Sequence, residues 1–556
     1  MSEEANTDNV FELGICMAGA VSAGAYTAGA MDYLIEALQT WEEKRGEPGV
    51  PSHRVVIKVI GGASAGGMTG IITASAINNP IPPISRLNHA NIFEEHPQNK
   101  LYHTWVDLLQ EDMFSLMLKN DDISQDKVYS LVNSGFIDAL SNRAVEVDAA
   151  NRVTRQYFDN NLRFFTTLTN IQGFRYKAAF LGDTDDYYLA RHNDFAAFIL
   201  NKQDEDYAND GFTPVDFFAR NNVDTARESA MATGAFPIGL KSRWLYRDKK
   251  HVEDLGWNRP PLDRYELEND PYRALIVDGG TLNNEPFLKV RDLMGYNKNT
   301  YQNDHSVIMI DPFPSERKDI EFNLKEDANT ITKVAGLTLG TMLSHARTKP
   351  ELLDEMYDPN NLSVFQIAPR KEINGDIEEG SDAIACGFME GFGGFLNKEF
   401  RIHDYFLGRA NCERFLREHF TVPDNTNHPV FLNGYQGVSN SIHKNSNKDR
   451  WQIIPLFEPE KSEPYFPPFQ HQHPDSWPVR DWKAVKKQYR RDIRLRVQAI
   501  AANIDLGKSK LLKGRIVNFL VGWFARNGVL NYIEKQMQCH KLLIGYPPCK
   551  DKDDKK

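Results

Sequence analysis

Ser64 lies at the centre of a glycine-rich turn that reads Gly62-Ala63-Ser64-Ala65-Gly66. This G-x-S-x-G follows an apolar run at residues 55–60 and precedes small, apolar residues that suit a packed helix. A strand, a sharp turn and a helix together expose such a serine at the carboxyl end of the strand, where the helix N-terminus favours developing negative charge. We interpret Ser64 as a nucleophile. The alternative is a bystander serine in a glycine-rich turn.

A second candidate for chemistry, Asp278, ends another apolar run. Residues 273–278 read R-A-L-I-V-D, and Gly279 and Gly280 follow directly. Functional residues of α/β proteins gather at the carboxyl ends of the strands, so Asp278 is placed where a site is built. The alternative is an aspartate that only caps the next turn.

A loop of small residues near the N-terminus is the third candidate. The apolar run at residues 11–17 leads into A-G-A-V-S-A-G-A-Y-T-A-G-A, which then takes on a helical pattern. A small-residue loop between strand and helix leaves backbone N–H groups to face an anion. A dinucleotide-binding loop fits less well because G-x-G-x-x-G is absent. We therefore expect an oxyanion hole at Gly19, Ala20, Val21 and Gly24.

The order of these stretches resembles that of the patatin-like phospholipase family. That family has a G-G-G-x-R/K-G loop, then G-x-S-x-G, and later D-G-G or D-G-A with N-N-x-P. The chain departs from the front half of the loop, where Ala20 and Val21 replace glycines and Ala23 replaces the usual cation. The matches to the later motif are Asp278, Gly279, Gly280, Asn283, Asn284 and Pro286. Residues 225–237 and 400–409 resemble further family segments, to which we assign packing and support roles.

The resemblance implies an α/β fold with a doubly wound, mainly parallel sheet. It also implies a Ser64–Asp278 dyad without histidine, supported by Gly62, Gly66, Gly279 and Gly280. The implied activity is that of a serine lipid acyl hydrolase, phospholipase A-like, which cleaves acyl esters through an acyl-serine without a metal or cofactor. Asp278 would orient the serine hydroxyl and accept its proton. Because a carboxylate with a pKa near ~3.9 is a weak base, we expect desolvation to raise this pKa.

Three other interpretations stay open at this point. An α/β-hydrolase-type esterase would use a triad of Ser64, Asp278 and a later histidine such as His403. It is disfavoured because Ser64 follows only the second apparent strand. An acyltransferase would pass the acyl group to an alcohol, and a catalytically inactive scaffold would explain the altered oxyanion loop.

Composition narrows the class of protein. The chain has 556 residues, a hydrophobic content of 41% and a net charge of −11, which argues against a nucleic-acid binder. Five cysteines without metal-ligand spacing favour a reducing compartment without a disulfide framework. An acidic N-terminus without signal-peptide layout, and no long apolar run, predict a cytoplasmic protein with at most a peripheral membrane contact.

We divide the chain into a catalytic domain at residues 8–415, an irregular linker or lid at 422–478 and an extension at 479–556. Within the first part, residues 80–160 are expected to form a helical cap, with a capped helix from Ser124 through residues 128–132. Strands are predicted at 164–168, 177–181 and 307–310, and a helix at 334–345.

The extension is basic and amphipathic. Between residues 479 and 513, eleven Lys and Arg residues stand against three Asp residues, a net charge of +8. One apolar face is expected, formed by Trp482, Val485, Tyr489, Ile493, Val497, Ile500 and Ile504. This helix either contacts an anionic membrane, where the substrate would be a phospholipid or other acyl-ester lipid, or docks on the body of its own chain.

Overall fold

The computed structural model describes most of the chain. The described residues are 9–87, 98–107, 112–124, 127–178, 187–201, 210–253, 269–295, 305–314, 362–373, 375–460, 463–473, 476–503 and 528–547, with a few isolated positions between these ranges. Of the predicted elements, almost all of the helix at 334–345 and the end of the basic segment at 504–513 lie outside these ranges.

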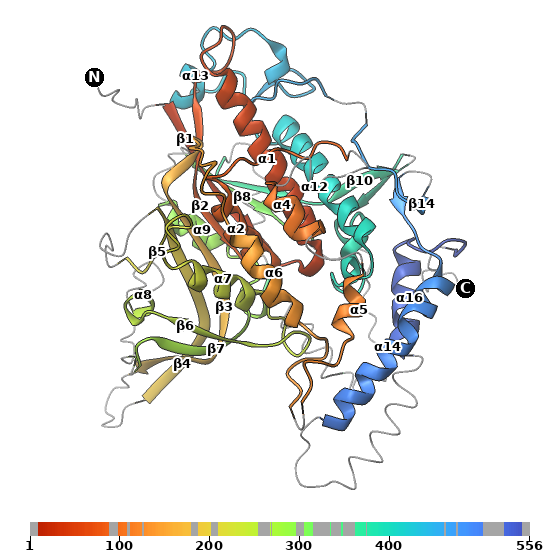
Figure 1. Ribbon diagram of the computed structural model, residues 1–556. Coiled ribbons are helices and arrows are strands. Elements are labelled where there is room, and N and C mark those ends of the chain that lie inside the picture. The colour runs from red at the N-terminus through yellow and green to blue at the C-terminus, as the bar shows by residue number, and fades with distance from the viewer. Residues whose placement is uncertain are drawn as a thin grey trace.

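A nine-stranded mixed sheet forms the centre of the described part of the molecule (Figure 1). Its path runs β5-β4-β3-β2-β1-β8-β9, and β7 pairs with both β3 and β6. β1 is parallel to β2 and β8, and β2 to β3, whereas β3 is antiparallel to β4 and β7. The strands are β1 (Val10–Met17), β2 (Arg54–Gly62), β3 (Phe158–Ala178), β4 (Tyr187–Leu200), β5 (Thr213–Val215), β6 (Arg243–Arg247), β7 (Tyr272–Asp278), β8 (His305–Ile310) and β9 (Val364–Ile367).

Helices cover both faces of this sheet. Alternate residues of β8 enter different cores: Ile308 joins the large cluster, and Val307 joins a smaller cluster that contains Val290 of α9. A strand buried on both faces carries apolar residues at consecutive positions, which is why these strands appear as uninterrupted apolar runs. The principal helices are α1 (Gly24–Lys44), α2 (Ser64–Ala76), α5 (Met113–Met117), α6 (Gly135–Val145), α7 (Val223–Thr233), α9 (Phe287–Leu293), α12 (Lys398–Glu418) and α13 (Pro429–Gly434).

The close contact of α1 with α12 depends on two glycines (Figure 1). A Cβ at Gly29 would lie 1.9 Å from the Tyr405 carbonyl oxygen, and one at Gly408 would lie 2.1 Å from that of Tyr26. The buried Arg401 on α12 donates hydrogen bonds to the carbonyl oxygens of Gly394 and Val106. Residues 400–409 therefore have the support role expected of them.

The doubly wound, mainly parallel α/β fold is confirmed, and β1, β2 and β8 lie where the apolar runs predict them. The predicted helix at 128–132 is wrong: these residues are irregular, and α6 begins only at Gly135. Their N–H groups at Leu131 and Val132 donate to the carbonyl oxygens of Ile238 and Gly239, so long-range contacts replace helical ones. Of the strand predicted at 177–181, residues 177–178 are the end of β3 and residues 179–181 lie outside the described ranges; the next described strand begins at Tyr187.

Residues 422–478 pack onto the body of the protein. They form short elements such as β12 (Thr421–Pro423) and α13, joined by irregular chain. Phe431, Ile453 and Trp477 are buried in the same cluster as the strands of the sheet. This segment is therefore irregular, as expected, and contributes to the core.

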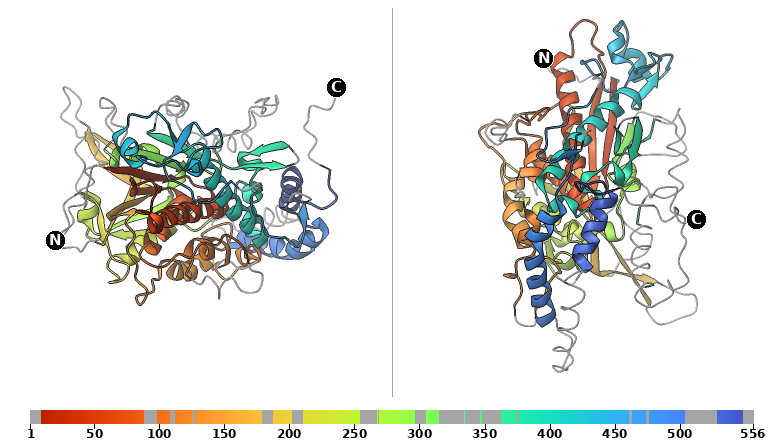
Figure 2. Two further views of the ribbon diagram at one scale, coloured as in Figure 1. Left: turned by 90° about the horizontal axis from the view of Figure 1, so that it is seen from above. Right: turned by 90° about the vertical axis from the view of Figure 1, so that its right-hand side faces the viewer.

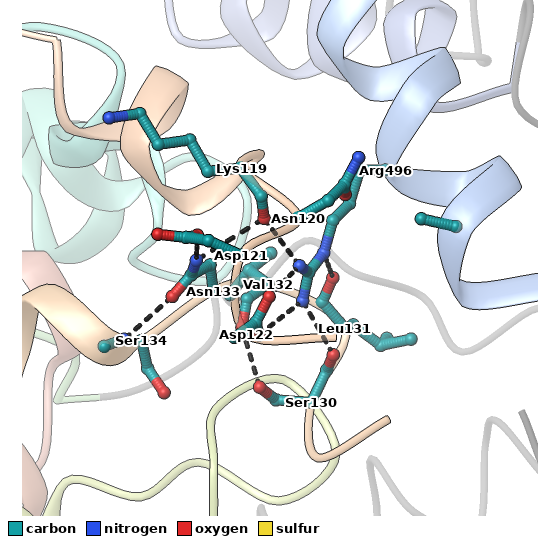
Figure 3. A network of polar contacts seen from close by, with 12 residues as sticks. Lys119, Asn120, Asp121, Asp122, Ser130, Leu131, Val132, Asn133, Ser134 and Arg496 are labelled. Carbon is teal, nitrogen blue, oxygen red and sulfur yellow. Dashed lines mark hydrogen bonds and ion pairs between the residues drawn. The ribbon is translucent and has the colours of Figure 1, made fainter. Parts of the chain in front are cut away.

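The basic segment contains α14 (Trp482–Asn503), followed later by α16 (Val529–Cys539), at one end of the molecule (Figures 1 and 2). The apolar face of α14 is turned to the protein body, where Trp482, Val485, Tyr489 and Ile493 are buried. The Tyr489 hydroxyl donates to Asp112 Oδ1 at 3.0 Å, and Arg496 enters a polar network with residues 119–134 (Figure 3). The sequence left open whether this helix contacts a membrane or docks on its own chain. Its apolar face docks on its own chain.

No helix in the described ranges combines the length and apolar composition that crossing a bilayer requires. Cys16, Cys386 and Cys412 are free and buried, but the expectation of a chain without disulfides does not hold at every cysteine. Cys539 differs, because it is disulfide-bonded.

Candidate active site

Ser64 lies on the sharp turn between β2 and α2, as its motif predicts. Its φ of 49° is in the left-handed region, which is a strained conformation for a residue with a side chain. The flanking glycines allow the turn to pack closely. A Cβ at Gly66 would lie 2.2 Å from the Met17 carbonyl oxygen, and one at Gly62 would lie 2.5 Å from the backbone of Gly66.

The structure brings Asp278 directly to Ser64, although 214 positions separate them in sequence. The Ser64 hydroxyl donates to Asp278 Oδ2 at 2.7 Å, and both side chains are buried. The N–H of Gly280 donates to the other carboxylate oxygen at 2.7 Å. These two hydrogen bonds fix the orientation of the carboxylate, with one oxygen facing the serine.

Asp278 is a buried carboxylate without a cationic partner among the described residues. Burial raises its pKa to about 7, while the hydrogen bonds from Ser64 and Gly280 act in the opposite direction. Burial disfavours the charged form because a low-dielectric environment solvates charge poorly. The carboxylate is thus a much stronger base than an exposed aspartate, in agreement with the expected desolvation.

The small-residue loop lies beside Ser64, and its members differ in their hydrogen bonds. A Cβ at Gly19 would come within 3.0 Å of Ser64 Cβ, so the loop touches the serine there. The N–H of Gly19 donates to the Asn284 carbonyl oxygen, and Gly24 is the first residue of α1, packed against Trp105. Ala20 and Val21, in contrast, have N–H groups that donate to no backbone acceptor among the described residues.

The small-residue helix α7 and the residues directly after it form hydrogen bonds with the backbone of both candidate residues. The Thr233 hydroxyl oxygen accepts a hydrogen bond from the Ser64 N–H at 2.9 Å. Directly after α7, the Ala235 carbonyl oxygen accepts one from the Asp278 N–H at 2.9 Å. Sequence reasoning assigned this segment a packing role but missed the specific contact of Thr233. Its position at the end of the small-residue helix was the available signal.

Ser22 and Gly391 also escaped the sequence prediction. The Ser22 hydroxyl donates to the Gly391 carbonyl oxygen and accepts from the Gly394 N–H at 2.9 Å. The Ser22 N–H donates to the same Gly391 oxygen at 3.0 Å. A residue 369 positions away in sequence thus holds the small-residue loop in place, and local sequence patterns do not predict a contact between such distant residues.

His403, the histidine of the alternative triad, has other partners. Its Nδ1 is hydrogen-bonded to Asp404 Oδ1 at 2.9 Å, and the Lys371 ammonium donates to its Nε2 at 3.0 Å. Burial, followed by the nearby Lys371 charge, lowers the pKa of His403 to about 4. Both ring nitrogens are therefore occupied away from Ser64, whose hydroxyl already contacts Asp278.

The described residues contain no cluster of three or more His, Cys, Asp or Glu side chains arranged to bind a metal ion.

Gly279 and Gly280 form the turn after β7. A Cβ at Gly279 would lie 2.1 Å from the Thr167 carbonyl oxygen, and one at Gly280 would lie 2.6 Å from Asn284 Oδ1. The turn that presents Asp278 can therefore form only with glycine at these positions.

The chain has similarities to known proteins. The chain is 29% identical over 581 aligned positions to "Uncharacterized protein y4iI" of Sinorhizobium fredii, covering 94% of this chain and 80% of that protein. A crystal structure of VipD from Legionella pneumophila aligns over 97% of this chain and 93% of its own, with 11% identity and a TM-score of 0.21, too low to support a comparison of folds. Residues 15–290, which include both Ser64 and Asp278, match the family model of patatin-like phospholipases. Residues 15–290 therefore form a domain of the patatin-like phospholipase family.

Proposed function

We propose that this protein is a serine lipid acyl hydrolase in which Ser64 is the nucleophile and Asp278 is the general base. The observation that carries the proposal is the 2.7 Å hydrogen bond between the Ser64 hydroxyl and a buried carboxylate. A serine hydroxyl is a weak nucleophile at neutral pH and needs an oriented base within hydrogen-bond reach. Asp278, with its pKa raised to about 7, is matched to that task.

In the acylation step, Ser64 Oγ attacks the ester carbonyl carbon while its proton passes to Asp278. The tetrahedral oxyanion accepts hydrogen bonds from the N–H groups of Ala20 and Val21, which have no backbone acceptor in the described part of the chain. Gly19 and Gly24 shape the loop in this proposal, because their N–H groups already have acceptors. Collapse of the intermediate expels the alkoxide, which takes the proton from Asp278.

In the deacylation step, water attacks the acyl-serine and gives a proton to Asp278. Collapse of the second intermediate returns that proton to Ser64 Oγ and releases the fatty acid. No histidine takes part, in keeping with the partners of His403 described above. The dipole of α2, which begins at Ser64, favours the negative charge of both intermediates.

The substrate is an acyl-ester lipid such as a phospholipid, and the enzyme meets it by peripheral contact with an anionic membrane. Within residues 479–513, the apolar face of α14 is buried on the protein body, so this contact uses exposed cations. Each Lys or Arg near such a surface contributes about 1 kcal/mol at most.

Labelling with a fluorophosphonate ester tests the proposal. We expect the wild-type protein to gain one covalent adduct at Ser64, measured by intact mass and peptide mapping, and to release fatty acid from phospholipid vesicles. Ser64→Ala should lose both properties while remaining folded. Absence of labelling in the folded wild-type protein would instead support the inactive-scaffold interpretation.

A further inference from the structure

Three large apolar side chains are exposed close together in the structure. Tyr129, Leu131 and Ile238 have exposed fractions of 53%, 51% and 69%. We call these three residues the rim patch. They come from two segments joined by backbone hydrogen bonds, since the Leu131 N–H donates to the Ile238 carbonyl oxygen at 2.9 Å. The patch is therefore one surface feature and not three scattered residues.

The rim patch adjoins the candidate active site. Ile238 lies three positions after Ala235, whose carbonyl oxygen accepts a hydrogen bond from the Asp278 N–H. The segment between α5 and α6, which carries Tyr129 and Leu131, lies next to the far end of α14 (Figure 1). The rim patch is therefore connected through residues 235–238 to the backbone that holds Asp278.

The backbone conformation of Ile238 destabilises the folded state. Its φ of 66° is in the left-handed region, where a β-branched side chain is strongly disfavoured and Asn or Gly is preferred. Its side chain gains little in return, because more than two thirds of it is exposed. Folding therefore does not explain an isoleucine at this position.

The C-terminal extension holds the rim patch in place through Arg496 (Figure 3). The Arg496 side chain is 2% exposed and pairs with the Asp122 carboxylate through both terminal nitrogens. It also donates to the carbonyl oxygens of Ser130 at 3.1 Å and Leu131 at 3.0 Å. The backbone on either side of the patch is thus fixed, so that its exposed side chains are presented by a rigid support.

One cation contacts the rim patch, and others lie along the neighbouring helix α14. The Lys241 ammonium lies 5.2 Å from the centre of the Tyr129 ring. The exposed face of α14 adds further positive charge from Lys483, Lys487, Arg490, Arg491 and Arg494. Aromatic and aliphatic side chains beside Lys and Arg suit the boundary between lipid headgroups and acyl chains. Three side chains are too few for a stable protein interface, which buries about 800 Å² per partner.

We propose that Tyr129, Leu131 and Ile238 insert into the surface of an anionic lipid bilayer and thereby place the Ser64 site against it. The benefit of placing Ser64 at the bilayer rests on the proposed function. Binding to the bilayer can be tested separately, because it depends on surface side chains and not on Ser64 or Asp278.

The test measures co-sedimentation of the full-length chain with vesicles of equimolar phosphatidylcholine and phosphatidylglycerol. All proteins carry Ser64→Ala, so that the vesicles stay intact and the outcome does not depend on ester hydrolysis. The variant is Leu131→Ser with Ile238→Asn. The matched control is Leu432→Asn, which removes a side chain of 59% exposure from α13, at the opposite end of the molecule (Figure 1).

We expect the double variant to lose about tenfold or more of its vesicle affinity, since two apolar side chains no longer leave water on docking. The control should bind as the parent does. Ile238→Asn alone should bind more weakly while its unfolding temperature stays equal or rises, because the strain is relieved. Equal vesicle binding by the parent and Ile238→Asn, or an equal loss in the Leu432→Asn control, would overturn the proposal.

Discussion

Asp278 and Asp122 are carboxylates with opposite surroundings. Asp278 is buried and receives hydrogen bonds only from neutral donors, the Ser64 hydroxyl and the Gly280 N–H. Asp122 is paired with the Arg496 guanidinium, which also binds three backbone carbonyl oxygens (Figure 3). A cation beside a carboxylate engages its oxygens in charge-assisted hydrogen bonds. The difference separates a group available for proton transfer from one committed to holding two segments together.

The two regions also differ in how the backbone is held. Around Asp278, a strand end and two glycine turns position the carboxylate, and close contacts leave no room for side chains at Gly279 or Gly280. Around Asp122, irregular chain is held by one arginine from a helix more than 370 positions away. The first arrangement is rigid because of its topology, whereas the second depends on a single side chain.

The largest expected effect concerns the dyad. We predict that Ser64→Ala and Asp278→Asn each lower the turnover of a soluble acyl ester by at least about a thousandfold, because each removes a group needed for acylation. Asp122→Asn is the matched control, since it neutralises a carboxylate outside the site. Steady-state hydrolysis measures all three. A loss in Asp122→Asn as large as that in Asp278→Asn would end the distinction between the two carboxylates.

The second prediction concerns pH. With Asp278 as the proposed base, activity should rise as the pH increases through about 7, the pKa to which burial raises this carboxyl. The pH profile of kcat/KM measures this effect. A profile that is flat from pH about 5 to 9 would contradict the assignment of Asp278 as the titrating base.

The contribution of Asp278 to the free energy of unfolding should fall as the pH rises, whereas activity should increase. The folded-state pKa of Asp278 is raised above the unfolded value of ~3.9, so its stabilising contribution is complete below that pH and is lost as the pH rises through about 7. Asp278→Asn should therefore be inactive yet more stable than the wild-type protein at pH about 8, by up to about 4 kcal/mol. Urea unfolding of both proteins at that pH and at pH about 5 would show whether the difference shrinks in acid.

The fourth prediction addresses the Arg496 network. Arg496→Met should lower the free energy of unfolding by about 2–4 kcal/mol, because it leaves Asp122 and several carbonyl groups without their partner. Arg45→Met, which breaks the more exposed pair with Glu42, should cost about 1 kcal/mol or less. If the two variants are equally stable in urea, the network does not hold the extension to the body.

The smallest effect is expected on the exposed face of α14. Replacing Lys487, Arg490 and Arg491 by glutamine should change the free energy of unfolding by less than about 0.5 kcal/mol, since these side chains are exposed. The same change should weaken binding to anionic vesicles by about 1 kcal/mol per cation at most, and less at high salt. Binding that is unchanged at low salt would exclude a contribution of this face to membrane contact.

Local pattern was sufficient for the elements that carry the dyad. The apolar runs before Ser64 and Asp278 predicted buried strands, and the glycines after them predicted tight turns, as found in β2 and β7. The helix predicted at 128–132 failed for a physical reason. Its apolar spacing is helical, but Leu131 and Val132 bond to residues 238–239, and Arg496 binds the carbonyl oxygens that a helix would use. Contacts across hundreds of positions outweighed local propensity.

By itself, the sequence indicated the family, the strands that precede the two turns, and Ser64 and Asp278 as candidate site residues, because each depends on residue types within a few positions of one another. The tertiary structure decided what depends on distant partners. It placed Asp278 2.7 Å from Ser64, occupied His403 with Asp404 and Lys371, and buried the apolar face of α14. An amphipathic helix carries the same pattern whether it faces a membrane or a protein, so only the folded chain distinguishes the two.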